Sequence, residues 1–265
     1  MKLDAITVVV AVNNRDVLNS NLLRSPLLQP GHGHQILIRE DFRSASLAYN
    51  DALSQARNEI VVFVHQDIYL PQHWLSDLKK TIDVLDTAKK RWGVIGCFGS
   101  RVDAKGGLGS VYSTGWGLQG KPIEKPEKVE TLDEIVLVIC RSSGLMFDPS
   151  LPYYHMYGVD ICLSARNTGL ECYAMPTFCI HNTTQLLALP AEFYACYRYV
   201  KRKWPGYLPI HSSCITISRF DGHLIRKKIE RAADLLRGRC AKGAPRLEDP
   251  RSVLPDSSIH ALSGG

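Results

Sequence analysis

Three ionisable side chains stand where an apolar segment of the sequence ends or a helix begins. Asp67 follows the run "IVVFV", His181 follows "TFCI", and Asp160 lies in "YYHMYGVDICLSARNTG". A carboxylate and an imidazole are suitable ligands for a divalent cation such as Mn²⁺ or Mg²⁺, and a second carboxylate nearby is able to accept a proton. Together the three residues predict a metal site beside a general base, if the fold brings them to one place.

Each of these residues also has an ordinary structural explanation. Asp67 alone fits a polar strand end, and Asp160 alone fits a carboxylate that the dipole of a helix N-terminus favours. His181 precedes "NTT" and fits a loop histidine with no ligand. One shared site accounts for all three positions at once, so we favour it over three separate explanations.

The elements that must position these residues alternate between strands and helices in the first half of the chain. The sequence predicts strands at 6–12, 35–38, 60–64 and 94–98, and helices at 44–57 and 74–90. That alternation predicts a parallel sheet covered by helices, with right-handed crossovers. Proteins of this class bind ligands at the carboxyl ends of the strands, so we expect Asp67 to face a site.

The second half of the chain is less regular. Residues 99–131 are rich in glycine, proline and lysine, and we interpret them as loops or a hairpin. A buried strand is predicted at 135–140 and a helix at 160–168, where Gly169 provides a C-terminal cap.

The end of the chain divides into two parts. Residues 219–239 predict a basic amphipathic helix, which we expect to dock on its own domain or on a second subunit. An anionic membrane is the alternative partner. We expect a single domain over 1–240 and a disordered tail over 241–265, where breakers are frequent and large apolar residues are few.

The composition is that of an ordinary soluble protein, with 45% hydrophobic and 22% charged residues in 265. No stretch approaches the roughly 20 apolar residues that span a bilayer, and the apolar stretch at 5–12 lacks a signal-peptide cleavage pattern. The eight cysteines form no Cys-x-x-Cys pair, so we expect reduced thiols in a cytoplasmic protein. The net charge of +6 favours acidic ligands such as nucleotides, but it is too small to predict nucleic-acid binding.

Four motifs carry a resemblance to a known family. In order, "SASLAYNDALSQA", "VVFVHQDIYLP", "HMYGVDICLSARNTG" and "CIHN" resemble the GT-A glycosyltransferases of family 2, especially the branch whose metal motif reads His-Gln-Asp. The later "RYVKRKWPGYLPI" is similar to the segment that closes many of these domains. The resemblance covers roughly residues 5–210. It implies a GT-A fold: a Rossmann-like α/β nucleotide-diphospho-sugar transferase with a mixed, mostly parallel central sheet.

The resemblance implies a role for each polar residue. Asp67 matches the last acidic position of the family's Asp-x-Asp motif, and His181 matches the histidine that completes the metal site in many members. Asp160 matches the catalytic base, which deprotonates the acceptor hydroxyl in a single displacement that inverts the anomeric carbon. His65 takes the place of the first aspartate, a position that often contacts the donor's ribose.

The nucleotide pocket follows from the same resemblance. The loop after the first strand would hold the nucleotide, which places Val12 and Asn13 nearby. An acidic residue after the second strand often reads the base. This chain offers Glu40 or Asp41 there, but the usual Asp-Asp-x-Ser run is missing, and a surface salt bridge is the ordinary alternative for both. Asn50, in the middle of its predicted helix, is a weaker candidate.

These expectations combine into a metal-dependent glycosyltransferase that moves a sugar from a nucleotide-sugar donor to a carbohydrate, glycolipid or metabolite acceptor. A nucleotidyltransferase is less favoured, because "AVNNRDVLN" lacks the glycine of a phosphate-binding loop. The non-enzymatic alternative is a degenerate domain that binds a nucleotide sugar or a partner protein without turnover, since His65 replaces an aspartate.

Overall fold

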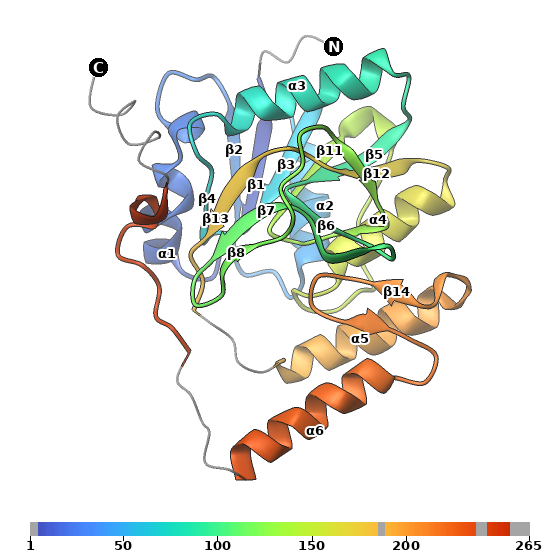
Figure 1. Ribbon diagram of the computed structural model, residues 1–265. Coiled ribbons are helices and arrows are strands. Elements are labelled where there is room, and N and C mark those ends of the chain that lie inside the picture. The colour runs from blue at the N-terminus through green and yellow to red at the C-terminus, as the bar shows by residue number, and fades with distance from the viewer. Residues whose placement is uncertain (1–4, 185–188, 237–242, 255–265) are drawn as a thin grey trace.

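The computed structural model describes residues 5–184, 189–236 and 243–254 (Figure 1). Its centre is a seven-stranded sheet with the order β2-β1-β3-β11-β5-β12-β9. These strands are β1 (Thr7–Ala11), β2 (Gln35–Arg39), β3 (Ile60–Val64), β5 (Trp92–Gly96), β9 (Glu127–Val129), β11 (Val136–Cys140) and β12 (Glu171–Ala174). The strand β11 is antiparallel to both β3 and β5, and β9 is antiparallel to β12, whereas the other pairs are parallel. Only β9 and β11 run against the other five strands, so the sheet is mixed and mostly parallel in strand direction, which confirms the predicted fold class.

Helices cover both faces of this sheet: α1 (Arg15–Ser20), α2 (Ala45–Gln55), α3 (Trp74–Thr87) and α4 (Tyr157–Asn167). Neighbouring residues of β1 point to opposite faces, as the two-residue period of a strand requires. Val9 belongs to an apolar cluster that includes Tyr49 of α2, and Val8 belongs to a second cluster that includes Trp74 of α3. The helix α2 starts where the sequence suggests, since the hydroxyl of Ser44 caps it by accepting the backbone N–H of Leu47.

A second sheet lies beside the first, with the order β10-β6-β7-β13-β4 and β8 paired to β7. Its strands are β4 (Ile68–Tyr69), β6 (Phe98–Arg101), β7 (Ala104–Ser113), β8 (Gly117–Gln119), β10 (Thr131–Leu132) and β13 (Phe178–His181). The interpretation of 99–131 as loops or a hairpin was therefore too simple. Its glycines permit close crossings: at Gly109, φ is +98° and an added Cβ would lie 2.0 Å from the carbonyl oxygen of Cys97.

The remaining elements close the domain: α5 (Ala191–Lys203), α6 (Gly222–Leu236), β14 (Ile210–His211), β15 (Thr216–Ile217), and short 3-10 helices at Leu22–Arg24, Pro26–Leu28, Arg141–Ser143, Pro205–Tyr207 and Pro250–Val253. Leu224 of α6 joins the cluster beneath α2, so this helix docks on its own domain, as favoured from the sequence. Residues 237–239 of the predicted helix lie outside the described residues. None of the helices in the described ranges has the length and apolarity that crossing a membrane requires.

The expectation of a disordered tail over 241–265 differs from the structure at 243–254. This segment returns to the edge of the second sheet, where Leu254 packs with Tyr69 and Ile180 (Figure 1). The segment is held by hydrogen bonds to Asn182, which is distant in the sequence. Local composition does not reveal such contacts. Residues 241–242 and 255–265 lie outside the described part of the chain.

Candidate metal and donor site

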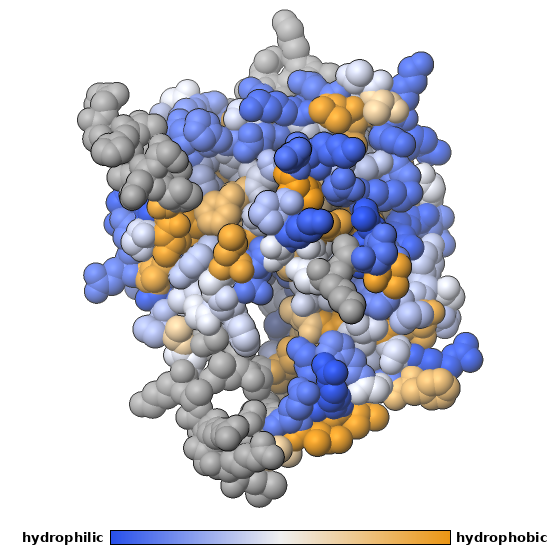
Figure 2. Space-filling view, in the orientation of Figure 1, coloured by the Kyte–Doolittle hydropathy of each residue, from blue (hydrophilic) through white to orange (hydrophobic). Residues whose placement is uncertain are grey.

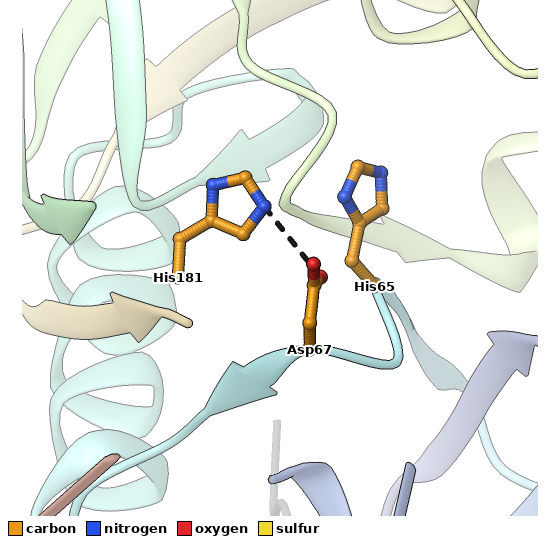
Figure 3. A group of neighbouring side chains, drawn as sticks. All are labelled: His65, Asp67 and His181. Carbon is orange, nitrogen blue, oxygen red and sulfur yellow. Dashed lines mark ion pairs between the residues drawn. The ribbon is translucent and has the colours of Figure 1, made fainter. Parts of the chain in front are cut away.

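Three side chains meet just beyond the carboxyl end of β3: His65, Asp67 and His181 (Figure 3). Each offers one ligand atom, and these atoms all lie within 4.8 Å of one another. The Nε2 atom of His181 is 3.5 Å from Oδ1 of Asp67, and the ring centroids of the two histidines are 5.9 Å apart. The structure brings together the two residues predicted as metal ligands and adds His65, which was predicted only as a donor contact.

Backbone hydrogen bonds hold the two parts of this group together. The strands β4 and β13 are antiparallel neighbours, and their register sets His181 opposite Ile68. The next residue, Asn182, donates its N–H to the carbonyl oxygen of Asp67 at 2.8 Å. Two segments that lie far apart in the sequence are thus fixed side by side at the sheet edge.

Tyr157, the first residue of α4, orients His65. Its hydroxyl lies 2.6 Å from Nε2 of His65 and 3.3 Å from the carbonyl oxygen of Glu134, to which it donates. A hydroxyl carries one proton, so when that of Tyr157 points to Glu134 the phenol oxygen can accept a hydrogen bond from Nε2–H of His65. That tautomer leaves the lone pair of Nδ1 available to a cation. No pattern in the sequence indicates this contact between Tyr157 and His65.

The charges in the group suit a bound cation. Burial by itself would raise the pKa of Asp67, but His181, His65 and Arg246 lower it below its usual value, so the carboxylate is ionised. Burial lowers the pKa of His65 and favours the neutral, ligating form. For His181, burial acts to lower the pKa, but Asp67 outweighs it and raises the pKa. One carboxylate and two imidazoles form a donor set that fits a transition-metal dication such as Mn²⁺ better than Mg²⁺, which prefers oxygen ligands.

A basic residue that sequence reasoning missed also reaches this group. A guanidinium nitrogen of Arg246 lies 3.7 Å from Oδ2 of Asp67. The Nε of Arg246 donates to the carbonyl oxygen of Asn182 at 3.1 Å. Arg246 belongs to the segment that was expected to be disordered, which is why its position was not predicted.

The loop after β1 is tied to the His-Gln-Asp motif through Gln66. Oε1 of Gln66 accepts the backbone N–H groups of Asn13 and Asn14, each at 3.1 Å. Its Nε2 donates to Oδ1 of Asn13 at 2.6 Å. Val12, just before, is buried, and its N–H donates to the carbonyl oxygen of Arg39. The predicted nucleotide loop therefore lies next to the metal group.

The other predicted nucleotide residues have surroundings of their own. Glu40 pairs with Arg15, which matches the ordinary alternative of a surface salt bridge, and the exposed Asp41 has a φ of 61°. Asn50 exchanges two hydrogen bonds with the backbone of Phe147, at 2.7 and 3.0 Å. Both polar atoms of Asn50 are used, so the structure gives it a structural role, and its contact with a nucleotide stays a prediction.

Asp160 lies one turn after Tyr157 on α4 but is not part of the three-residue group. It is 1% exposed, and its carboxylate is held by the last residue of α5 and the residue after it: Nζ of Lys203 lies 2.8 Å from Oδ1, and Nε1 of Trp204 donates to Oδ1 at 2.7 Å. Burial raises the pKa of Asp160, although Lys203 and Trp204 act in the opposite direction. The carboxylate is more basic than an ordinary aspartate but is already paired.

Glu134 is a second carboxylate at this end of α4. It accepts backbone N–H groups from Gly158, Met156 and Tyr157, which start the helix. Burial, with the charge of Asp133, raises the pKa of Glu134 well above its usual value. Among the described residues it has no ion pair with a basic side chain. It is therefore an acidic group beside Tyr157, the partner of His65, and no described basic side chain forms an ion pair with it.

Comparisons with known proteins give one family match. A sequence model described as "Glycosyltransferase like family" matches residues 7–189. The curated protein "ATP synthase subunits region ORF 6" of Fuscovulum blasticum is 26% identical over 168 residues, which cover 61% of this chain and 66% of that protein. This chain thus spans slightly less than two thirds of that relative.

Two solved structures have a limited similarity. The S. aureus TarS fragment 1-349 in complex with UDP is 15% identical, with a TM-score of 0.45, and the similarity covers 75% of this chain and 65% of that chain. The A197 protein from STIV is 10% identical, with a TM-score of 0.39, over 66% of this chain and 81% of that chain.

Proposed function

Because this chain belongs to the glycosyltransferase-like family, whose match spans residues 7–189, we propose that it transfers a sugar from a nucleotide-sugar donor to an acceptor hydroxyl. The observation that carries the proposal is the meeting of His65, Asp67 and His181 within 4.8 Å, beside the loop at Asn13. A metal group next to a nucleotide loop suits cleavage of a sugar–diphosphate bond, because a cation there can stabilise the departing diphosphate.

The metal is part of the proposal. When bound, Mn²⁺ or Mg²⁺ supplies positive charge that stabilises the departing diphosphate. Asp67 and His181 would hold it, with Nδ1 of His65 as a third ligand, since Tyr157 occupies the other ring nitrogen of His65. The loop at Val12 and Asn13, fixed by Gln66, would position the nucleotide.

Asp160 is proposed as the base that takes the acceptor's proton in an inverting displacement. Its raised pKa supports this role, because a more basic carboxylate accepts a proton more readily. Its pairing with Lys203 opposes the role in the described conformation, and the acceptor would have to displace that contact. Glu134 is the second candidate, because its pKa is raised and no basic side chain is described on it.

The test begins with binding. Titration calorimetry with a panel of nucleoside diphosphates and nucleotide sugars, with and without Mn²⁺, compares the native protein with Asp67→Ala and His181→Ala. His73→Ala is the control, because His73 is an exposed histidine outside the group. We expect the native protein to bind one donor when metal is present. The donor affinity of Asp67→Ala and of His181→Ala should be at least about tenfold weaker, and that of His73→Ala should equal the native value. If no nucleotide or nucleotide sugar binds the native protein with metal present, the proposal fails.

Turnover then separates the two carboxylates. With the donor identified, Asp160→Asn and Glu134→Gln are assayed for donor hydrolysis and transfer. We expect Asp160→Asn to retain donor binding and lose at least about a hundredfold in rate, as removal of a general base does. Loss in Glu134→Gln instead would transfer the role to Glu134. Donor binding by a native protein that shows no turnover with any acceptor tested would favour the degenerate binding domain.

A membrane surface is the proposed location of the acceptor. Phe220, Ile225 and Ile229, on and just before α6, are 84%, 51% and 63% exposed, and Arg226 and Lys228 are exposed beside them. Figure 2 shows apolar surface along the lower edge of the molecule, where α6 lies in Figure 1. Apolar side chains flanked by cations suit an anionic lipid surface. The free thiols of the described cysteines support a reducing, cytoplasmic location.

Sedimentation with vesicles tests this contact. We expect the protein to sediment with vesicles that contain phosphatidylglycerol and not with pure phosphatidylcholine, and the double variant Ile225→Ser with Ile229→Ser to remain in solution. Val84→Ser is the control, since Val84 is 50% exposed on α3 instead. Equal recovery in solution with both kinds of vesicle would remove the membrane from the proposal.

A further inference from the structure

The C-terminal segment 243–254 is built against the metal group through Asn182. The side chain of Asn182 accepts the N–H of Leu247 at 2.7 Å and donates to the carbonyl oxygen of Leu247 at 2.9 Å. It also donates to Oδ1 of Asn21 at 2.7 Å, and the residue is 1% exposed. A buried amide with this many partners fixes the backbone of the segment where it passes the site.

The same residue fixes the direction of Arg246. The carbonyl oxygen of Asn182 accepts Nε of Arg246, and the N–H of Asn182 donates to the carbonyl oxygen of Asp67. The guanidinium is consequently set over Asp67, at 3.7 Å from Oδ2, with its side chain 36% exposed. Arg246 thus faces the group from a part of the chain outside the family match at 7–189.

The positive charge of Arg246 beside Asp67 indicates what Arg246 could bind. The carboxylate that would hold the divalent cation is the one that Arg246 contacts, so guanidinium and cation compete for Asp67. When a cation is bound, two positive groups lie close together and need an anion between or beside them. A diphosphate meets that need, because its oxygens bind a metal and also accept the paired N–H groups of a guanidinium.

We propose that Arg246 binds the diphosphate of the donor, and that it rests on Asp67 while no metal is bound. This inference depends on the proposed function, since it names a further binding residue of the same site. The segment 243–254 then supplies a cation to the leaving group in addition to the metal. A purely structural ion pair between Arg246 and Asp67 is the competing explanation, and it predicts that loss of Arg246 does not specifically weaken pyrophosphate binding.

The experiment measures two affinities in Arg246→Ala, Arg246→Lys and the native protein. The first is for Mn²⁺ alone, by electron paramagnetic resonance of the free ion. The second is for inorganic pyrophosphate at saturating Mn²⁺, by calorimetry. Arg251→Ala is the matched control, because Arg251 lies in the same segment but pairs with Asp249.

We expect Arg246→Ala to bind Mn²⁺ alone at least about threefold more tightly, since its competitor for Asp67 is gone. We expect the same variant to bind pyrophosphate with Mn²⁺ at least about tenfold more weakly, the loss typical of one charge-assisted contact. Both affinities of Arg246→Lys should lie between those of the native protein and those of Arg246→Ala, because lysine retains the charge without the paired geometry. Arg251→Ala should match the native protein in both affinities.

Unchanged pyrophosphate binding in Arg246→Ala would overturn the inference and leave the metal site and proposed function intact. Weakening of both affinities together would also overturn it, since that is the result expected when the residue only holds the site in shape. If the native protein binds Mn²⁺ but no nucleotide, or neither ligand, the proposed function fails first and the inference fails with it.

Discussion

The hydroxyl of Tyr157 lies 2.6 Å from Nε2 of His65, so the first residue of α4 sets the ring of a candidate metal ligand. We expect Tyr157→Phe to lower Mn²⁺ affinity about tenfold, the usual effect of removing the partner that orients a ligating imidazole. Tyr49→Phe is the control, because the hydroxyl of Tyr49 lies 3.5 Å from that of Tyr157 and contacts the same aromatic cluster. Equal Mn²⁺ affinities in native protein and Tyr157→Phe would show that the contact does not serve a metal.

Gln66 should matter for the nucleotide more than for stability. Gln66→Ala removes its bonds to Asn13 and Asn14, but these groups are exposed and water replaces the lost partner. We expect the free energy of unfolding to fall by less than about 1 kcal/mol and nucleotide affinity to fall about threefold to tenfold. Calorimetry and urea unfolding measure the two effects. Gln119→Ala is the control, because the side chain of Gln119 bonds the nearby carbonyl oxygens of Trp116 and Leu118. A large loss of stability without any loss of affinity would contradict this division.

Asp148 gives a pH-dependent contribution to stability. Burial acts to raise its pKa, but Lys203, Tyr199 and the N–H of Ser150 outweigh burial and lower it. The folded pKa is therefore below the unfolded value of about 3.9, so the contribution is complete above about pH 5 and is lost as pH falls through the folded pKa. We expect the free energy of unfolding of Asp148→Asn at pH 7 to be about 1–2 kcal/mol lower than that of the native protein.

The same unfolding measurement, repeated between pH 7 and pH 3, should show the gap between native protein and Asp148→Asn closing below about pH 4. A gap that stays constant over the whole range would show that the lost contribution is packing and not the ionised carboxylate.

Asn182 should control the C-terminal segment. Since its side chain bonds both the N–H and the carbonyl oxygen of Leu247, Asn182→Ala should speed the exchange of the Leu247 amide proton at least about tenfold. The loss of these buried partners should also lower the free energy of unfolding by about 1–3 kcal/mol. Hydrogen exchange followed by NMR measures the first effect, and Arg246→Ala, which retains both bonds, is the control. Slow exchange of Leu247 in Asn182→Ala would mean that the segment is held by other contacts.

The sequence predicted the central sheet because its signals are local. An apolar run such as Ile60–Val64, with strand neighbours on both sides, needs no distant information to be identified as buried. The polar residues after it identified one end of the site, and β13 brings His181 to the expected place. That Asp67 and His181 bind a metal, and that Asp160 is the base, stay predictions.

What the sequence could not provide are the partners across long separations. Asn50 was a weaker candidate for a nucleotide contact, and its two hydrogen bonds to the backbone of Phe147 follow from no local pattern. The hydroxyl of Tyr157 and the guanidinium of Arg246 reach the site only because α4 and the C-terminal segment pack where they do. Glycine-rich residues 99–131 suggested loops, because the same residue type permits both a turn and a close strand crossing.

The return of the C-terminal segment also sets an order of events during synthesis. During translation, His65, Asp67 and His181 emerge from the ribosome before Arg246, which follows them in the sequence. Because the N-terminal parts of a nascent chain begin to fold first, Asp67 and His181 can meet while the guanidinium is still absent. A cation that encounters the unfinished chain therefore finds the carboxylate without its competitor. Under the arrangement proposed above, Asp67 binds a cation most readily before Arg246 has been synthesised. After folding, the bound substrate helps the protein to retain the ion.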